Sequence, residues 1–295
     1  MALIIDGKII AEQIRFEIKN KTEKLLAERG IKPGLAVLLI GENPASQVYV
    51  RAKEKACVEA GFYSLVIRMP EAVSENEVLS LIKSWNTDNN IHGILVQLPL
   101  PKHIDEMKAL LSISPQKDVD GFHPENIGRL VVGLPGFVPC TPAGIMELFK
   151  RTNILLSGKH VVVVGRSNIV GKPMLNLLYQ KSKHANAIVT ICHTGTKNIR
   201  MFTKEADVLI AAIGVAHRIG ADDVKEGVVV IDVGMNKIVD SSTKSGTRLV
   251  GDVDFNEVFP KASAITPVPK GVGPMTIAML LENTYRSATG EIFVK

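Results

Sequence analysis

The stretch GKHVVVVGRSNIVGKP, residues 158–173, decides the fold class. Four consecutive valines at 161–164 predict a fully buried strand, because uninterrupted β-branched runs are typical of parallel sheets covered on both faces. A glycine turn follows at Gly165, and the apolar run over 174–180 predicts a helix with Pro173 in its first turn. Strand, tight turn and helix in this order bring backbone N–H groups to a helix N-terminus, where phosphates bind.

The turn indicates a dinucleotide site without matching the usual fingerprint. That fingerprint is Gly-x-Gly-x-x-Gly, whereas this turn has Gly165-x-Ser167-x-x-x-Gly171. A strand, a glycine and a helix also make an ordinary βα connection, so this segment alone leaves both interpretations open. Residues 148–204, however, contain ten Lys or Arg and no Asp or Glu, which favours an anionic ligand.

The charge pattern favours NADP over NAD. The next predicted strand, 188–193, runs into Thr194 without a carboxylate. NAD-preferring sites usually place an acid there, on the ribose 2′-OH, and such an acid would repel a 2′-phosphate. We therefore expect NADP, with Arg166 and Thr194 as the candidate 2′-phosphate contacts. The alternative is a solvated basic face.

Composition limits the class of protein. The chain has 295 residues, 46% of them hydrophobic and 5% aromatic, with a net charge of +5. Basic blocks interleaved with aromatics are absent, so we do not expect nucleic-acid binding. Cys57, Cys140 and Cys192 stand far apart, which predicts neither disulfides nor a zinc site. The N-terminus does not resemble a signal peptide and no apolar run is long enough to span a membrane, so we expect a cytoplasmic protein.

Strands and helices alternate along the chain, which predicts two α/β domains with parallel sheets. Segment 112–140 is rich in Gly and Pro, and we expect it to run between the domains without regular structure. Strands are expected at 35–40, 65–69, 91–98, 160–164, 188–193, 207–213, 228–233 and 264–268. Helices are expected at 8–29, 45–60, 74–85 (opened by a Ser74-x-x-Glu77 capping box), 141–151, 174–180 and 274–288.

Two side chains share a face of the second predicted helix. Tyr49 and Lys53 are four residues apart, so a ring and an amine stand side by side. They are suited to holding a flat substrate and moving protons, although an isolated pair of this kind is more often a surface Lys beside a half-buried Tyr. Gln97 ends a buried strand, at the edge where ligands bind in α/β sheets. It either hydrogen-bonds a ligand or Lys53, or it satisfies a turn.

Other candidates are weaker on their own. Asp118 and Asp120 suggest an Asx-turn or one buried carboxylate that pairs with a cationic or N–H-rich ring, more than a metal site. Cys140 is expected to be a small buried residue and not a nucleophile. The stiff loop 266–276 opens the last helix and either offers N–H groups to a ligand or is a rigid connector.

Taken together, these segments resemble the bifunctional methylenetetrahydrofolate dehydrogenase/cyclohydrolase family. They occur in the family's order and cover nearly the whole chain, and jointly they are highly specific. The matching segments are YVRAK (49–53), VQLPLP (96–101), KDVDGF (117–122), PCTP (139–142), GRSNIVGKP (165–173), DVG (232–234), GDV (251–253) and PVPKGVGPMT (267–276).

The resemblance implies a two-domain α/β homodimer with its active cleft between the domains. The folate-binding catalytic domain would be 1–139, with 275–295 returning to it as a C-terminal helix, and 140–274 would be a Rossmann-like NADP-binding domain. The enzyme would oxidise 5,10-methylenetetrahydrofolate with NADP and hydrolyse the methenyl product to 10-formyltetrahydrofolate. Its metabolic setting would be one-carbon metabolism, which supplies purine biosynthesis.

The resemblance also implies residue roles. Lys53 would be the essential amine, Tyr49 would stack on the folate, Gln97 would support Lys53, and Asp120 would anchor the pterin. Further folate contacts would come from Val96, Leu98, Pro99, Pro267, Lys270 and Gly271, and NADP contacts from Gly165, Arg166, Ser167, Thr194 and Ile231.

One position departs from the family. Lys270 stands where the family usually has glycine, and at a positive φ it costs about 1 kcal/mol or more. It also brings a cation near the expected folate site, where a glutamate tail would meet it. Two rival hypotheses remain at this stage: another NADP dehydrogenase on the same architecture, of the shikimate type, and an NADP-binding regulator without turnover. The combination of Tyr49, Lys53, Gln97 and Asp120 speaks against both.

Overall fold

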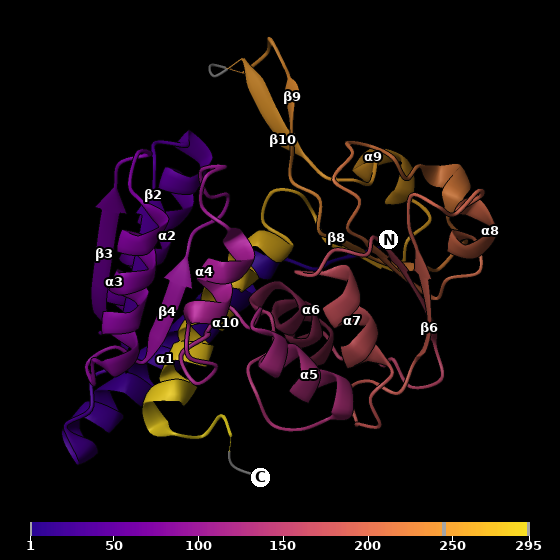
Figure 1. The fold of residues 1–295 in the computed structure, drawn as a ribbon. Coiled ribbons are helices and arrows are strands. Elements are labelled where there is room, and N and C mark those ends of the chain that lie inside the picture. Colours follow the sequence, from indigo (N-terminus) through magenta and orange to yellow (C-terminus); the bar gives the residue numbers. More distant parts are fainter. Residues whose placement is uncertain (1, 244–245, 294–295) are drawn as a thin grey trace. The chain divides into compact units, whose positions relative to one another are not determined.

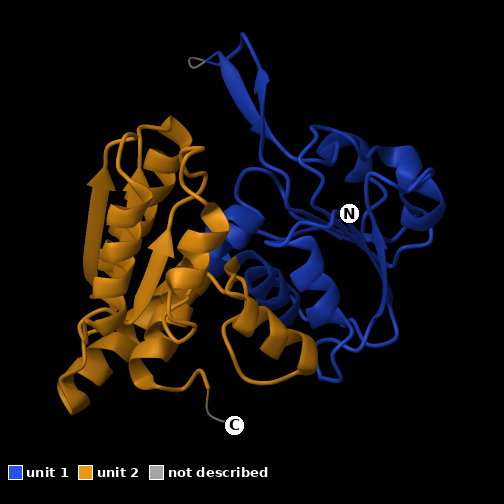
Figure 2. Cartoon of the chain, viewed as in Figure 1, with its two compact units in different colours: residues 1–11, 141–276 blue, residues 12–140, 277–295 orange. Residues whose placement is uncertain are grey.

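The computed structural model describes residues 2–243 and 246–293. They form two compact units, coloured separately in Figure 2. Unit 1 comprises residues 1–11 and 141–276, and unit 2 comprises residues 12–140 and 277–295. The expected mixed α/β fold with two domains is confirmed. The extreme N-terminus differs from the expectation, because residues 1–11 group with unit 1.

Unit 2 is built on a small parallel sheet with the strand order β3-β2-β4. The last helix, α10, begins in unit 1 and continues into unit 2 (Figure 1). The elements are α1 (Gly7–Arg29), β2 (Gly34–Ile40), α2 (Pro44–Glu59), β3 (Tyr63–Met69), α3 (Glu75–Thr87), β4 (Gly93–Val96), α4 (Glu106–Ser112), α5 (Pro124–Val132) and α10 (Val272–Thr289).

Unit 1 is built on a six-stranded sheet, β1-β11-β8-β7-β5-β6, in which every neighbouring pair is parallel. A separate antiparallel hairpin, β9–β10, extends from it (Figure 1). The elements are β1 (Leu3–Ile4), α6 (Cys140–Arg151), β5 (His160–Val164), α7 (Gly171–Leu178), β6 (Ile188–Cys192), α8 (Arg200–Thr203), β7 (Val208–Ala211), η1 (Ala221–Asp223), β8 (Val229–Asp232), β9 (Asn236–Val239), β10 (Thr247–Val250), α9 (Phe255–Val258) and β11 (Ala264–Ile265).

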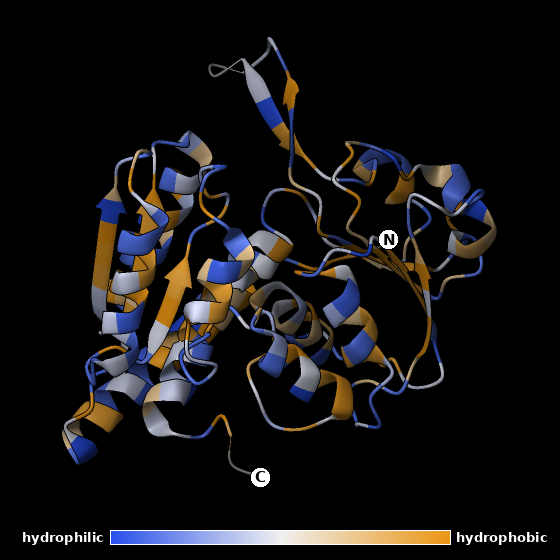
Figure 3. Cartoon of the chain, in the orientation of Figure 1, coloured by the Kyte–Doolittle hydropathy of each residue, from blue (hydrophilic) through white to orange (hydrophobic). Residues whose placement is uncertain are grey.

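The central strands are apolar because both faces of each sheet are covered. In Figure 3 they are mainly orange, whereas the helices alternate between blue and orange. All seven residues of β2 are buried, as are residues 161–164 of β5. In unit 2, one face of the sheet packs against α3 through Val78, Ile82 and Trp85.

Local sequence signals are confirmed at several helix ends. Ser74 and Glu77 form the expected capping box of α3. Asn43 caps α2, and its Oδ1 accepts hydrogen bonds from the N–H groups of Ala45 and Ser46. Helix α6 begins at Cys140, so Thr141 lies inside the helix and not at the expected N-cap.

The expectation that 112–140 lacks regular structure is wrong, because the segment contains α5 within unit 2. The glycine and prolines that suggested a loop are here the start and stop signals of a short helix. Pro124 occupies its first turn, His123 caps it, and Gly133 ends it with φ 73°. The hairpin β9–β10 and the two-residue strand β1 were also not expected.

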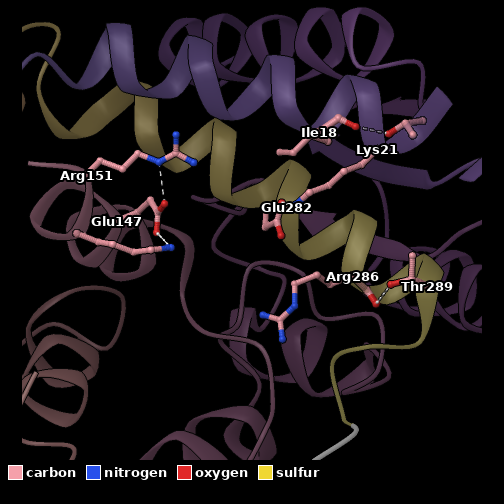
Figure 4. A network of polar contacts seen from close by, with 9 residues as sticks. Ile18, Lys21, Glu147, Arg151, Glu282, Arg286 and Thr289 are labelled. Carbon is pink, nitrogen blue, oxygen red and sulfur yellow. Dashed lines mark hydrogen bonds and ion pairs between the residues drawn. The ribbon is translucent and has the colours of Figure 1, made fainter. Parts of the chain in front are cut away.

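The expected return of the C-terminal helix is confirmed. Within unit 2, α10 lies beside α1, where Nζ of Lys21 is 3.6 Å from Oε2 of Glu282 (Figure 4). The Ser287 hydroxyl donates to the backbone carbonyls of His92 and Gln116. In unit 1, Glu147 accepts a 2.8 Å hydrogen bond from Arg151, also drawn in Figure 4. None of the helices in the described part of the chain is both long and apolar enough to cross a membrane.

Candidate active site and cofactor turn

Helix α2 carries the Tyr49–Lys53 pair in the expected arrangement. The cap at Asn43 and the proline at Pro44 fix where the helix begins, so residues 49 and 53 fall one turn apart on one face. Lys53 is only 8% exposed, whereas Tyr49 is 39% exposed. Partial burial raises the pKa of Tyr49, so its hydroxyl stays protonated. The interpretation of Lys53 as an ordinary surface lysine is therefore wrong.

Lys53 donates a 2.9 Å hydrogen bond from Nζ to Oε1 of Gln97. Gln97 directly follows β4, at the carboxyl edge of the unit 2 sheet. Its Nε2 donates to the Leu98 carbonyl at 2.9 Å, which turns the amide oxygen toward the ammonium. The hydroxyl of Ser46 donates to the same carbonyl, at 3.4 Å. The Leu98–Pro99 peptide is cis. Within the described residues the amine is thus held by one polar contact, to the side chain that follows β4.

Asp120 supplies a carboxyl group beside this amine. Burial raises its pKa, while the positive charge of Lys53 and the thiol of Cys140 act in the opposite direction. Cys140 is buried and donates from Sγ to the Val119 carbonyl at 3.3 Å. Burial and the nearby Asp120 raise the thiol's pKa well above its usual range. Cys140 therefore stays a neutral thiol, as expected from the sequence.

Asp118 has a different environment from Asp120. Its carboxylate is 1% exposed and accepts hydrogen bonds from the N–H groups of Phe122 and His123 and from Nδ2 of Asn126. Burial raises the pKa of Asp118 to about 7. These contacts organise the turn into α5, but they come from the fourth and fifth residues after Asp118, so they are not those of an Asx-turn, which bonds two residues on. Both carboxylates line a small cavity of about 50 Å³ together with Leu98 and other apolar residues.

In unit 1 the turn after β5 brings backbone close to backbone. Gly165 has φ 134°, and a Cβ on it would lie 2.2 Å from the Ala212 carbonyl oxygen. A Cβ on Gly171 would lie 2.1 Å from the Gly165 carbonyl oxygen. Distances under 3 Å exclude any side chain at either position. These two glycines therefore allow a tight turn and close backbone packing, as the glycines of the common fingerprint do, at a different spacing.

Ser167 and the start of α7 complete this turn. The Ser167 Oγ accepts hydrogen bonds from the N–H groups of Val170, at 3.1 Å, and Gly171, at 3.4 Å. The N–H of Lys172 donates to the Ser167 carbonyl at 3.1 Å. Arg166 and Ser167 are exposed. The turn thus presents an open basic and polar surface at a helix N-terminus, where an anion binds favourably.

The remaining predicted NADP contacts follow the sheet register. Val164 and Cys192 are register partners on neighbouring strands, and Arg166 and Thr194 each lie two residues beyond them. Both are exposed at the same edge of the sheet. Ile231, in β8, is fully buried. The roles of these residues stay predictions, and Ile231 exposes no surface to a ligand.

The predicted folate residues of unit 1 lie on the loop before α10. Lys270 is exposed and has φ 87°, so the condition under which a lysine is strained at this position is met. Its carbonyl accepts a 2.9 Å hydrogen bond from the N–H of Lys8. A Cβ on Gly271 would lie 2.5 Å from the Pro267 carbonyl oxygen. The loop is therefore tightly wound, and the lysine occupies its strained position.

Known proteins match the chain over nearly its whole length. The family model described as tetrahydrofolate dehydrogenase/cyclohydrolase, catalytic domain, matches residues 5–120, and that described as the NAD(P)-binding domain of the same enzymes matches residues 139–292. The chain belongs to the tetrahydrofolate dehydrogenase/cyclohydrolase family. Membership removes the rival hypothesis of a shikimate-type dehydrogenase.

Relatives in this family are close in sequence and structure. A bifunctional protein FolD from Chloroherpeton thalassium is 58% identical over 97% of this chain and 98% of its own. The crystal structure of the bifunctional FolD enzyme from Campylobacter jejuni has a TM-score of 0.93 at 51% identity, covering 98% of this chain and 99% of that one. The Trypanosoma brucei FolD, complexed with NADP cofactor and inhibitor, has a TM-score of 0.92 at 36% identity, covering 99% of both chains.

The sequence did not point to one residue that contacts the candidate site of unit 2. Asn283, on α10, is 5% exposed, and its Nδ2 donates to the carbonyls of Val119, at 2.8 Å, and Val138, at 3.2 Å. It thereby ties the turn that carries Asp120 to the segment before Cys140. No local pattern marks this asparagine, because its partners are 164 and 145 residues away in the chain.

Proposed function

We propose that the chain oxidises 5,10-methylenetetrahydrofolate to 5,10-methenyltetrahydrofolate with NADP and then hydrolyses the product to 10-formyltetrahydrofolate. The observation that carries the proposal is the buried ammonium of Lys53, hydrogen-bonded to Gln97 and close enough to Asp120 for their charges to interact. Among the described residues Gln97 is the one acceptor of a hydrogen bond from this amine, whereas an ammonium ion has three donors to satisfy. Here the other donors are available to a substrate.

The first step needs positioning more than proton transfer. The hydride leaves a carbon between two nitrogens, whose lone pairs stabilise the developing cation. NADP supplies the hydride acceptor when it is bound. On the enzyme side, Tyr49 offers a half-exposed ring for stacking on the flat substrate. Asp120 offers a carboxyl oxygen to the N–H groups of the pterin.

The second step adds water to the methenyl cation and must move protons. Lys53 is the group placed to do so, since its Nζ lies 2.9 Å from Oε1 of Gln97 on the turn after β4. The Gln97 amide can accept a hydrogen bond from the ammonium form but does not itself take the proton. The substrate cation would favour release of a proton from Lys53 by like-charge repulsion.

The glycine turn of unit 1 fits the pyrophosphate of a dinucleotide. Gly165 and Gly171 let the backbone approach closely, and α7 presents its N-terminus there. NADP is the preferred cofactor in this proposal, because Arg166 and Thr194 lie at the end of β5 and β6 in a segment without any carboxylate. The matching domain family is described as NAD(P)-binding and the Trypanosoma relative is complexed with NADP. The domain description fits either nicotinamide dinucleotide, and the Trypanosoma relative supports NADP.

We also infer a homodimer in the cytoplasm. The order β3-β2-β4 leaves the outer edge of β3 without a neighbouring strand in the described ranges. An open edge of seven residues is a template for a strand of a second copy. Sedimentation of the purified chain tests this, and a monomer at micromolar concentration would contradict it. The cytoplasmic location stays a prediction from the sequence.

The first experiment mixes the purified chain with 5,10-methylenetetrahydrofolate and NADP, and follows reduced cofactor and methenyl product separately by absorbance. Reduced cofactor with little methenyl accumulation is expected. Accumulating methenyl product would contradict the cyclohydrolase half of the proposal. If neither NADP nor NAD is reduced, the chain is an NADP-binding regulator and the enzyme proposal fails.

A further inference from the structure

Two motifs of unit 1 have no role in the chemistry described so far, DVG at 232–234 and GDV at 251–253. Their aspartates are almost completely buried, Asp232 at 4% exposure and Asp252 at none. Asp232 accepts hydrogen bonds from the N–H groups of Gly234 at 2.9 Å, Asp252 at 3.0 Å and Val253 at 3.0 Å. Asp232 therefore fixes the backbone that carries Asp252.

Asp252 in turn binds three consecutive amides of another loop. Its oxygens accept from the N–H groups of Ile213 at 2.6 Å, Gly214 at 3.0 Å and Val215 at 3.0 Å. A fourth bond, 2.8 Å, comes from Nδ2 of Asn236 at the start of β9. Three successive N–H groups turned to one point form a small anion-binding concavity, and here a side chain of the protein fills it.

The glycines of both motifs make room for these carboxylates. A Cβ on Gly251 would lie 1.7 Å from Oδ2 of Asp232. A Cβ on Gly234 would lie 2.3 Å from Oδ1 of Asp252. The two motifs therefore form one interlocked unit, in which each aspartate needs the glycine of the other motif.

The loop that Asp252 holds lies directly against the cofactor turn. Ala212 donates from its N–H to the Val164 carbonyl at 2.8 Å, and its own carbonyl oxygen is the atom that a Cβ on Gly165 would meet at 2.2 Å. The position of residues 212–215 thus sets the space available beside Gly165. This loop leaves the carboxyl edge of β7, the edge where ligands of parallel sheets bind.

We propose that Asp252 is a positioning residue for NADP, acting through the amides of residues 213–215. The inference rests on the proposed function and extends it to residues that touch neither folate nor the reacting atoms. Because the concavity is already filled by Asp252, the loop keeps one conformation before the cofactor arrives. A preorganised wall lowers the cost of ordering the loop on binding.

The test uses a property of the bifunctional enzyme: hydrolysis of the methenyl substrate needs no cofactor. In Asp252→Asn an amide N–H₂ replaces one acceptor oxygen, so at least one of the three loop amides loses its partner. We expect the KM for NADP to rise about tenfold or more, with hydrolysis of 5,10-methenyltetrahydrofolate within twofold of wild type. Asp223→Asn is the matched control, because Asp223 is also buried in unit 1 but binds Gly220 and Arg200.

A second variant covers the case in which Asp252→Asn fails to fold. Asn236→Ala leaves the carboxylate in place and removes only its side-chain donor, and a smaller rise of the KM for NADP is expected, again without loss of hydrolysis. Equal loss of both activities, or an unchanged KM in a folded variant, would overturn the proposal. Failure of the proposed function is distinguishable, since it would show in the wild-type chain.

Discussion

The two candidate sites use the chain in different ways. In unit 2, chemistry rests on side chains: Lys53 on helix α2, Gln97 directly after β4, and Asp120 interact through their functional groups. In unit 1, the cofactor turn depends on the backbone: Gly165 and Gly171 are required because a Cβ at either position would clash with a backbone oxygen. The difference teaches that one substitution can remove a reaction from unit 2, whereas substitutions in unit 1 act by changing geometry and affinity.

The largest effect is expected for Lys53→Met. Methionine keeps the apolar stem and removes the only ammonium that donates to Gln97 in the described residues. Loss of a proton-transferring group typically costs about 10²- to 10⁴-fold, so cyclohydrolase activity should fall by that amount. The dehydrogenase, which depends on positioning, should fall less. Separate assays of the two reactions check this.

Lys55→Met is the matched control, because Lys55 is on the same helix with its side chain 78% exposed, in a surface ion pair with Glu59. It should leave both activities within about twofold, since exposed ion pairs contribute little. If Lys53→Met reduces both reactions equally, Lys53 positions the substrate and does not carry the proton. The contrast between the two units would then lose its chemical basis.

Arg166→Ala tests whether a side chain of unit 1 determines the preference for NADP over NAD. Removing a cation that faces a 2′-phosphate should lower kcat/KM for NADP by about 10- to 100-fold, the value of a charge-assisted hydrogen bond. The value for NAD, which lacks the phosphate, should hardly change. Steady-state kinetics with both cofactors measure the ratio, and a preserved NADP/NAD preference would remove Arg166 from the site.

Lys172→Ala is the control for the same turn. Lys172 is also exposed, but its Nζ donates to Oδ1 of Asn168, at 2.6 Å. A general loss of basic charge would lower NADP use in both variants alike. A specific phosphate contact lowers it only in Arg166→Ala, so the pair of variants separates the two interpretations of the basic segment 148–204.

How far the sequence predicts this molecule depends on the range of the interaction. The buried strand 161–164, the glycine turn and the capping box of Ser74 are local patterns, and all three appear in the structure. Tyr49 and Lys53 share a helix face because helical spacing is local as well. Helix α5 was missed because proline and glycine mark both loops and helix ends, and the contacts of Asp118 with His123 and Asn126 at the start of the helix are not visible in that pattern.

Contacts between distant segments could not be predicted from the residues alone. Asn283 meets Val119 across 164 positions, and Asp252 meets Ile213 across 39. Neither asparagine nor aspartate carries a signal for such a partner, and both were assigned no role by the sequence. Gln97 was found because a strand end is recognisable, although the choice between Lys53 and a turn needed the structure, which shows that it does both.

The buried Asp118 of unit 2 predicts that the free energy of unfolding depends on pH. Burial raises the pKa of Asp118 from its ordinary value of 3.8 to about 7, so folding favours its protonated form. Its contribution to the free energy of unfolding therefore falls as the pH rises from about 4 to about 7, and is level above that. Asp118→Asn lacks this titration. Between pH 5 and pH 8 its free energy of unfolding should therefore rise relative to that of wild type, by on the order of 2 kcal/mol.

Urea unfolding of both proteins at the two pH values gives the comparison. The asparagine also disturbs the hydrogen bonds to Phe122 and His123, but this cost is present at both pH values and cancels in the difference. A stability gap that is the same at pH 5 and pH 8 would show that Asp118 is ionised throughout. The raised pKa of Asp118 would then be wrong.

The smallest effect is expected for Lys270→Gly, where backbone and side-chain contributions oppose each other at one residue. A lysine at φ 87° costs about 1 kcal/mol that glycine avoids, so the variant should unfold at a slightly higher temperature.

If the exposed ammonium meets a carboxylate of the folate glutamate tail, its loss should weaken folate binding by up to about fivefold at low salt, the range of an exposed ion pair. Calorimetric titration with a folate that carries several glutamates measures the second effect, and Lys270→Arg, which keeps both the charge and the strain, is the control. Unchanged affinity in the glycine variant would mean that the strained lysine serves no ligand, and that its side chain contributes nothing to folate binding.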